Sequence, residues 1–303
     1  MKLRRSMLFL PANNPGLIRD VHIYKPDSVM FDLEDAIAMS EKDAARILIH
    51  NMLKALKDIY QELEIETVVR INALTTKFWE QDLAAVVSAG VDMVRIPMTE
   101  HPEDVITASD YISQIEKQCG REEGSTKIMV AIETALGVMN SFEIAKTKYK
   151  TDRLVAMALS AEDFVTSMKT SRSISGEELF TARGMIAMAA RACDLEVLDT
   201  VYTDINNDEG FLKEANLIKT MGFGGKSLIH PKQVELIHSV FTPTETEIIK
   251  AQKIIRATNK AAAQNLGVFT VDGKMVDGPI IERARRVIQL AMATNLISEE
   301  DAQ

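Results

Sequence analysis

Short apolar runs alternate with amphipathic segments along most of this chain. The runs are continuous rather than alternating, which is typical of parallel strands buried on both faces. The segments between them carry apolar residues at helical spacing, and Gly90 and Gly222 lie where helix C-caps are expected. The predicted strands are Ser6–Ala12, Ser28–Asp35, Thr67–Ala73, Met93–Met98, Lys127–Thr134, Leu154–Asp163, Glu196–Tyr202 and Gly225–Pro231. The predicted helices include Glu41–Lys57, Phe78–Ser88, Glu103–Cys119, Glu177–Cys193 and Asn207–Thr220.

Eight strand–helix units predict a single α/β domain, a (β/α)8 TIM barrel, over residues 1–241. A doubly wound open sheet is the alternative. The count of eight favours the barrel, as does the lack of a Gly-x-Gly-x-x-Gly turn after the first strand.

The pattern changes after residue 241. A long helix is predicted from Glu245 to about Asn265, then a hairpin over Gly267–Gly278 that turns at Asp272-Gly273, and a final helix after Pro279. We expect residues 242–303 to form a C-terminal arm that packs on a neighbouring subunit, since such an arm can reach another copy more easily than its own barrel mouth.

Composition narrows the class of protein. The net charge of −9 argues against a nucleic-acid partner, and 46% hydrophobic residues support a large core in 303 residues. Cys119 and Cys193 fall in helical stretches without metal-ligand spacing, so buried reduced thiols are expected. The basic start resembles a signal peptide, but its apolar run Met7–Leu10 is too short and stops at Pro11. With no run of about 20 apolar residues, we expect a soluble cytoplasmic protein without a membrane partner.

Charged residues fall on one face of five successive predicted strands, near their carboxyl ends. Side chains alternate along a strand, so residues beside an outward apolar position point into the barrel. Active sites of such barrels lie at the carboxyl ends of the strands. The residues predicted at this mouth are Asp32, Glu34, Arg70, Asn72, Arg95, Glu133 and Asp163.

Glu133 and Asp163 end consecutive apolar runs. Neighbouring strands lie roughly 4.8 Å apart, so two carboxylates at equivalent strand ends can hold one cation. Oxygen ligands without His or Cys favour Mg²⁺ over zinc. Asp32 and Glu34 fit a surrounding layer that orients metal-bound water.

Arg70 offers a planar guanidinium for a carboxylate or a developing oxyanion. The alternative is that Arg70 and Arg95 pair with the acids as structural salt bridges, which suits Arg95 better than Arg70. A metal and an arginine over a small oxo-acid suit the cleavage or formation of a carbon–carbon bond beside a carbonyl.

Seven blocks of sequence resemble the citrate lyase beta subunit family, in order, from about residue 4 to residue 290. The stretch from Cys119 to Thr126 resembles the citrate lyase branch more than malyl-CoA or citramalyl-CoA lyases. The blocks are Arg5–Pro11, Phe31–Asp35, Val69–Asn72, Ala131–Thr134, Ala161–Asp163, Gly225–Pro231 and Gly273–Pro279.

The resemblance implies a Mg²⁺-dependent barrel that splits a 3-hydroxy-acyl thioester by retro-Claisen cleavage. In the citrate lyase member, citryl on an acyl carrier protein or on CoA yields oxaloacetate and the acetyl thioester. The implied partners are the citrate lyase alpha subunit, the acyl carrier protein (gamma) subunit and further copies of this chain, as a trimer or hexamer.

The resemblance also implies roles for individual residues. Glu133 and Asp163 match the metal ligands, and Arg70 matches the arginine that binds the keto acid. Asp277 matches the catalytic acid/base that reaches a neighbouring subunit's barrel, although an Asp before Pro279 can also simply cap a turn. Arg5, with Arg4, lies where relatives hold the phosphates of the thioester carrier, although basic residues near a terminus are often solvated.

Two other functions stay open at this stage. One is a stand-alone malyl-CoA or citramalyl-CoA lyase that uses the same site. The other is a catalytically silent assembly subunit, and the intact set Arg70, Glu133, Asp163 and Asp277 argues against it.

Overall fold

The computed structural model describes residues 2–263 and 268–300. These residues form two compact units, Arg4–His238 and a second unit made mainly of the chain from Ser239 onwards. Each unit is described by itself.

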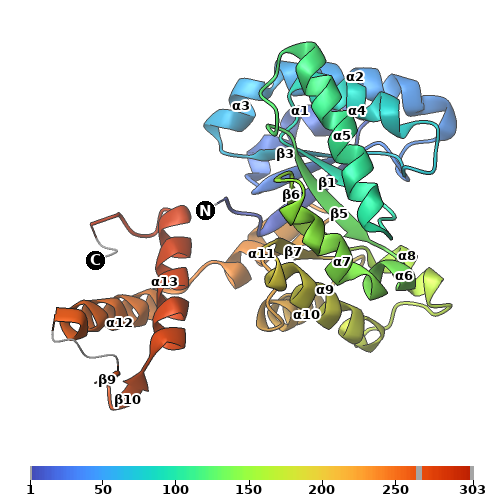
Figure 1. Ribbon diagram of the computed structural model, residues 1–303. Coiled ribbons are helices and arrows are strands. Elements are labelled where there is room, and N and C mark those ends of the chain that lie inside the picture. The colour runs from blue at the N-terminus through green and yellow to red at the C-terminus, as the bar shows by residue number, and fades with distance from the viewer. Residues whose placement is uncertain (1, 264–267, 301–303) are drawn as a thin grey trace. The chain divides into compact units, whose positions relative to one another are not determined.

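The first unit is a closed barrel of eight parallel strands in chain order, with β8 hydrogen-bonded back to β1 (Figure 1). The predicted (β/α)8 barrel is therefore confirmed, and the open sheet is excluded. The strands are β1 Ser6–Pro11, β2 Ser28–Asp32, β3 Glu66–Arg70, β4 Met93–Ile96, β5 Lys127–Ile132, β6 Leu154–Leu159, β7 Glu196–Asp199 and β8 Gly225–Leu228.

Helices follow each strand, and several begin or end at recognisable caps. Gly90 is the left-handed C-cap of α4, and Gly222 follows α10 with a φ of 95°, as the sequence predicts. The helices through α11 are α1 Pro15–Asp20, α2 Lys42–Ala55, α3 Lys57–Glu62, α4 Trp79–Ala89, α5 Pro102–Cys119, α6 Ala135–Met139, α7 Ser141–Ala145, α8 Ala161–Ser167, α9 Phe180–Ala192, α10 Asp208–Thr220 and α11 Lys232–Phe241. Short 3₁₀ turns are η1 Val21–Tyr24, η2 Met39–Glu41, η3 Lys146–Tyr149 and η4 Glu177–Leu179.

Every barrel strand ends before its predicted carboxyl end. The largest difference is in β6, predicted to Asp163 but ending at Leu159, because the chain enters α8 at Ala161. Asp32, Arg70 and Arg95 still lie within their strands, whereas Glu34 and Glu133 lie beyond the strand ends and Asp163 lies in α8.

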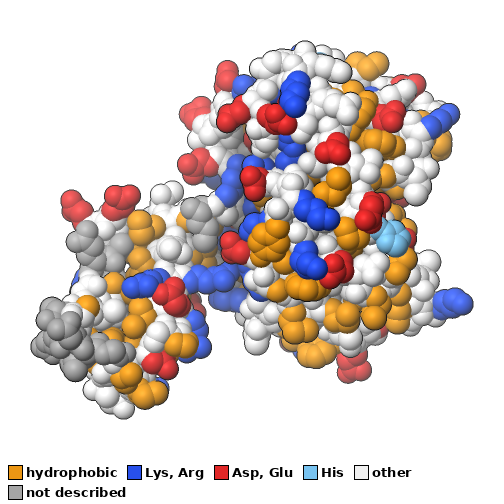
Figure 2. Space-filling view, viewed as in Figure 1, with side chains coloured by type: hydrophobic (Ala, Val, Ile, Leu, Met, Phe, Trp, Pro, Cys, Tyr) orange, Lys and Arg blue, Asp and Glu red, His pale blue; other side chains and the backbone are white. Residues whose placement is uncertain are grey.

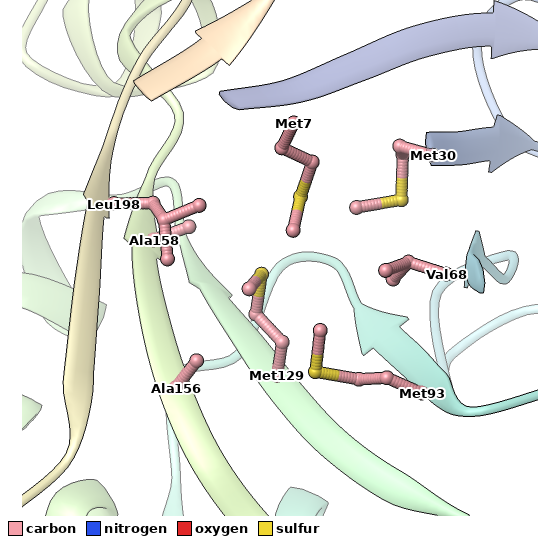
Figure 3. Close-up of a cluster of buried hydrophobic side chains, with 8 residues drawn as sticks. All are labelled: Met7, Met30, Val68, Met93, Met129, Ala156, Ala158 and Leu198. Carbon is pink, nitrogen blue, oxygen red and sulfur yellow. The ribbon is translucent and has the colours of Figure 1, made fainter. Parts of the chain in front are cut away.

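Methionines fill the centre of the barrel. Met7, Met30, Met93 and Met129 come from four different strands, are fully buried, and point toward one another (Figure 3). They pack with Val68, Leu198 and two small residues of β6, Ala156 and Ala158. Flexible thioether side chains fit an irregular interior that branched residues would fill less easily. This layer forms the floor beneath the mouth of the barrel.

Closure of the barrel requires glycine at the start of β8. A Cβ added to Gly225 would lie 1.9 Å from the carbonyl oxygen of Arg4. The first and last strands can therefore approach each other only because residue 225 has no side chain.

The second unit contains α12 Glu245–Ala263, the antiparallel strands β9 Phe269–Val271 and β10 Lys274–Val276, and α13 Gly278–Ala293. Asp272 and Gly273 both have positive φ, as a tight two-residue hairpin requires. The predicted helix, hairpin and final helix are thus confirmed, while the predicted ends at Asn265 and Gly267 lie outside the described residues. The core of this unit is Ala251, Ile254, Val276, Ala284 and Ile288.

The surface of the barrel is mixed in character. Charged side chains of both signs cover much of the face in Figure 2, while hydrophobic side chains gather over α7 and α9. The exposed hydrophobic residues of these two helices include Phe142 of α7 and Met188 of α9, and Met139 and Tyr149 nearby in the chain are exposed too. Across residues 2–263 and 268–300, no helix combines the length and hydropathy needed to cross a membrane.

Candidate active site

The predicted alternation places charged side chains directly above the methionine layer. Met30, Val68 and Met93 lie in the barrel centre, so Asp32, Arg70 and Arg95 two residues further on share the inward face. The strand register also aligns these three residues, with Asp32 beside Arg70 and Arg70 beside Arg95. The inward positions are therefore confirmed for these three residues.

Acidic side chains surround Arg70. Its Nε and Nη2 donate to the two carboxylate oxygens of Asp32 at 2.8 and 2.6 Å. Its Nη1 lies 2.8 Å from Glu34 and 3.2 Å from Asp35. The sequence predicted that the guanidinium of Arg70 faces the substrate. In the structure, the edge formed by Nε and Nη2 is hydrogen-bonded to Asp32.

Asp32 binds Arg70 and the loop after β2, and its expected role in orienting metal-bound water stays a prediction. Its carboxylate accepts the backbone N–H groups of Glu34 and Ala36 as well as the two bonds from Arg70. Burial acts to raise the pKa of Asp32, but the hydrogen bonds and charge of Arg70 outweigh it and lower that pKa. Asp32 is thus a fixed anion that orients Arg70.

Glu34 has the opposite electrostatic environment. Burial, together with the carboxylates of Glu133, Asp35 and Asp32, raises the pKa of Glu34 to about 8 against the opposing charge of Arg70. The structure thus brings Glu34 to Arg70 at the mouth. Sequence reasoning missed Asp35, whose carboxylate accepts a hydrogen bond from Nη1 of Arg70.

Glu133 extends past the end of β5 into the mouth, as predicted. Its Oε2 accepts the backbone N–H of Met98 at 2.8 Å, and Met98 adopts a left-handed φ of 49° there. Its Oε1 is buried and has no hydrogen-bond partner among residues 2–263 and 268–300. Burial raises the pKa of Glu133, and the nearby Arg95, Ser160 and the N–H of Met98 oppose that shift.

Asp163 reaches the mouth from a helix and not from a strand. It lies in the first turn of α8, so the predicted sharing of a strand face with Leu159 and Ala161 is wrong. Burial raises its pKa, with a contribution from the charge of Asp35 and an opposing one from Arg70. Asp163 is thus near enough to Arg70 and Asp35 for their charges to act on it.

Arg95 is as buried as Asp32 and Glu133. Its Nη2 donates to Ser160 Oγ at 2.6 Å and lies 4.0 Å from Glu133 Oε1. The ring of Phe9 contacts both arginines, with its centroid 5.4 Å from Cζ of Arg95 and 5.6 Å from Cζ of Arg70. Sequence reasoning missed Phe9 and Ser160. Each comes two residues after a side chain in the barrel centre, Met7 or Ala158, so strand alternation predicts that both point inward.

Two predicted residues serve the fold and not the cluster. Asn72 donates its side-chain amide to Asp82 at the start of α4 and to the carbonyl of Leu33, so it ties the end of β3 to its neighbours. Arg5 precedes β1 and pairs with Asp27 at 2.8 Å, at the amino-terminal end of the barrel. The structure therefore does not bring Arg5 to the mouth, which lies at the other end of the strands, and the expected substrate contact is wrong for this site.

Asp277 belongs to the second unit. It is the N-cap of α13, and its side chain accepts the backbone N–H of Ile280 at 3.4 Å. The capping role weighed from the sequence is therefore present. The catalytic role stays a prediction.

The acidic cluster suits a divalent cation. Four carboxylates, those of Asp32, Glu34, Asp35 and Glu133, lie within 4.0 Å of Arg70 or Arg95, and the charge of Arg70 also acts on Asp163. Burial raises the pKa of Glu34, Glu133 and Asp163. Within the described residues no group of three or more His, Cys, Asp or Glu side chains is placed to enclose a metal. Mg²⁺ commonly takes only one or two carboxylates and keeps several waters. The unpartnered Oε1 of Glu133 and the all-oxygen donor set fit such an ion.

Known proteins share this chain's sequence and fold. The family model HpcH/HpaI aldolase/citrate lyase matches residues 5–231. The citrate lyase subunit beta of Haemophilus influenzae is 51% identical and covers 96% of this chain and 98% of its own. The mitochondrial citramalyl-CoA lyase of Mus musculus is 31% identical over 95% of this chain and 86% of its own.

One solved structure adds a ligand-bound example. The citrate lyase beta subunit of M. tuberculosis, complexed with oxaloacetate and magnesium, aligns with a TM-score of 0.64 and 28% identity, and covers 80% of this chain and 100% of that one. The family model, the near-full-length relatives and the barrel agree, and the chain belongs to the HpcH/HpaI aldolase/citrate lyase family.

Proposed function

We propose that this chain is the lyase (beta) subunit of a citrate lyase. It would cleave citryl, carried on an acyl carrier protein or on CoA, to oxaloacetate and the acetyl thioester. The observation that carries the proposal is the 51% identity, over nearly the whole chain, to a citrate lyase subunit beta, against 31% to a citramalyl-CoA lyase. The arginine and carboxylates gathered at the barrel mouth suit this reaction.

The reaction breaks one carbon–carbon bond. The hydroxyl of the citryl group loses its proton, the bond from the hydroxyl-bearing carbon to the thioester α-carbon breaks, and the electron pair passes into the thioester enolate. The hydroxyl-bearing carbon becomes the ketone of oxaloacetate. A proton added to the α-carbon then gives the acetyl thioester, so atoms and charges balance.

Glu133 and Asp163 would hold Mg²⁺, which the related M. tuberculosis protein binds together with oxaloacetate. When bound, the ion polarises the oxygen on which negative charge develops. Glu133 is prepared for this role because the backbone N–H of Met98 fixes one carboxylate oxygen and leaves the other free to bind a ligand.

Arg70 would bind the carboxylate of the keto acid. Asp32 holds Nε and one hydrogen of Nη2, which orients the guanidinium before substrate arrives. Preorganised charge of this kind stabilises a transition state without reorganisation. The keto acid would then compete with Glu34 and Asp35 for the remaining hydrogens.

Asp277 of another copy would donate the proton to the α-carbon, as a positioned general acid. The proposal therefore includes a homo-oligomer, in addition to an alpha subunit and an acyl carrier protein. Exposed hydrophobic side chains on α7 and α9, including Phe142 and Met188, supply a surface for such partners (Figure 2). Free cysteines, Cys193 buried and Cys119 exposed where burial was expected, are compatible with a cytoplasmic location.

A cleavage assay with the purified full-length chain tests the proposal. Citryl-CoA, malyl-CoA and citramalyl-CoA are supplied with and without Mg²⁺, and the keto acid released is measured. We expect Mg²⁺-dependent oxaloacetate from citryl-CoA and no cleavage of the other two. Cleavage of malyl-CoA or citramalyl-CoA alone would identify a stand-alone lyase, and no cleavage of any thioester would identify an assembly subunit.

A further inference from the structure

Arg95 carries donors that the fold does not use. Its side chain is only 2% exposed, and its one hydrogen bond runs from Nη2 to Ser160 Oγ. Its Nε and Nη1 are buried and have no hydrogen-bond partner in the described part of the chain. Buried guanidinium groups are normally fully bonded, so unused donors of this kind need an explanation.

Other buried arginines of the barrel keep a carboxylate partner even where one nitrogen is unused, as Arg183 does by donating to both oxygens of Asp199 while its Nη1 has no partner among the described residues. Arg153 donates to both carboxylate oxygens of Glu116 and to the carbonyl oxygen of Thr126. Arg70 donates to Asp32 through two nitrogens and to Asp35 through the third. Among the described residues, Arg95 has neither a carboxylate nor a carbonyl within hydrogen-bond distance.

The surroundings of Arg95 indicate the chemistry of the missing partner. Glu133 Oε1 is also unpartnered among residues 2–263 and 268–300, and it stands 4.0 Å from Nη2, too far for a hydrogen bond. Burial and the charge of Arg70 lower the pKa of Arg95 to about 10, so the group stays a cation at neutral pH. A small anion bound beside Glu133 would satisfy Nε or Nη1, and the ring of Phe9 offers an apolar wall for a short stem.

We propose that Arg95 binds the carboxylate of the substrate's extra carboxymethyl arm. This inference rests on the proposed citryl thioester cleavage. At the carbon where a citryl thioester carries this arm, a malyl thioester has hydrogen and a citramalyl thioester has a methyl group. Arg70 binds the carboxylate that all three substrates share, and Arg95 distinguishes citryl from the other two. The side chains that cover Nε and Nη1 must shift to admit the carboxylate.

Keto-acid binding tests the inference without turnover. Oxaloacetate and pyruvate differ by this one carboxylate, and their dissociation constants are measured by calorimetry on the full-length chain with saturating Mg²⁺. Arg95→Met should weaken oxaloacetate binding on the order of 10- to 100-fold, the effect of losing a charge-assisted hydrogen bond. Pyruvate binding should not change. Arg70→Lys is the matched control, and it should weaken both keto acids.

Each other result overturns the inference. Equal weakening of oxaloacetate and pyruvate by Arg95→Met, together with weaker Mg²⁺ binding, would mean that Arg95 holds Glu133 in place. Unchanged oxaloacetate binding would mean that Arg95 has no role in recognition. If Arg95→Met fails to fold, Arg95→Lys carries the test, with a smaller loss that is still selective for oxaloacetate. Failure of citryl-CoA cleavage by the wild type would refute the proposed function, whereas the comparison of keto acids tests Arg95 alone.

Discussion

The proposed metal site predicts that Mg²⁺ stabilises the protein through Glu133 and Asp163. Both carboxyl groups have raised pKa values, and Oε1 of Glu133 has no hydrogen-bond partner in the described residues. A divalent cation would offset this unfavourable charge. Glu133→Gln or Asp163→Asn should remove most of the stabilisation by Mg²⁺ and abolish turnover.

The size of the effect follows from mass action. A ligand at 100 times its dissociation constant stabilises the native state by about 2.7 kcal/mol. For a unit the size of the barrel, each kcal/mol raises Tm by roughly 2–4 °C, so the rise in Tm is roughly 5–10 °C. Protons compete with Mg²⁺ for carboxylates of raised pKa. The rise in Tm caused by Mg²⁺ should therefore be larger at about pH 8 than at about pH 5, because a larger fraction of both carboxyl groups is protonated at the lower pH.

Thermal unfolding with increasing Mg²⁺ measures this effect directly. Glu162→Gln is the matched control for Asp163→Asn, because Glu162 lies in the same helical turn but pairs with Arg172. The control should keep the full rise in Tm. The reasoning is refuted if both site variants keep the wild-type rise, if the rise grows on acidification, or if turnover persists in excess chelator.

Three further predictions concern other parts of the molecule. Arg70→Lys keeps the charge but loses the paired bonds to Asp32, so kcat/KM should fall on the order of 10²-fold or more; a near-normal value would mean that Arg70 is a structural ion pair. Mixtures of Asp277→Asn and Glu133→Gln chains should regain partial activity if Asp277 acts in a neighbour's barrel, and inactive mixtures that still assemble would contradict this. Glu116→Gln should cost about 3–5 kcal/mol in denaturant unfolding at neutral pH, because it leaves Arg153 buried without its carboxylate. The pKa of Glu116 is lowered from 4.5 to about 2, so the wild type should lose this stability as pH falls through that range while the variant does not; equal acid sensitivity would refute the assignment.

The architecture and the inward-facing residues could be predicted because both depend on simple periods. Eight apolar runs of strand length fit one closed barrel, and the two-residue alternation fixes the side to which each side chain points. Arg70, Arg95 and Glu133 are correct for this reason. Asp163 was assigned to the wrong element, since hydropathy does not mark the point where a strand ladder ends and a helix begins.

The partners of each charged residue could not be predicted in the same way. The bond between Asp32 and Arg70 depends on the register between β2 and β3, which brings together residues far apart in sequence. The position of Arg5 could have been found from the sequence. It precedes the first strand, and strand amino ends lie opposite the active-site end of a barrel.

Oxidation of the methionines at the barrel centre can also be used to measure how often the barrel strands separate. Met7, Met30, Met93 and Met129 are fully shielded, whereas Met39, Met139 and Met188 are about 70% exposed. An oxidant such as hydrogen peroxide converts a thioether to its sulfoxide only where it can reach the sulfur. The exposed group should therefore oxidise at once and serve as an internal standard, while the central group should oxidise only as fast as the strands separate. Peptide mass spectrometry would then time the opening of the floor beneath the site, and a comparison with and without Mg²⁺ would show how firmly an ion at the mouth holds the barrel closed.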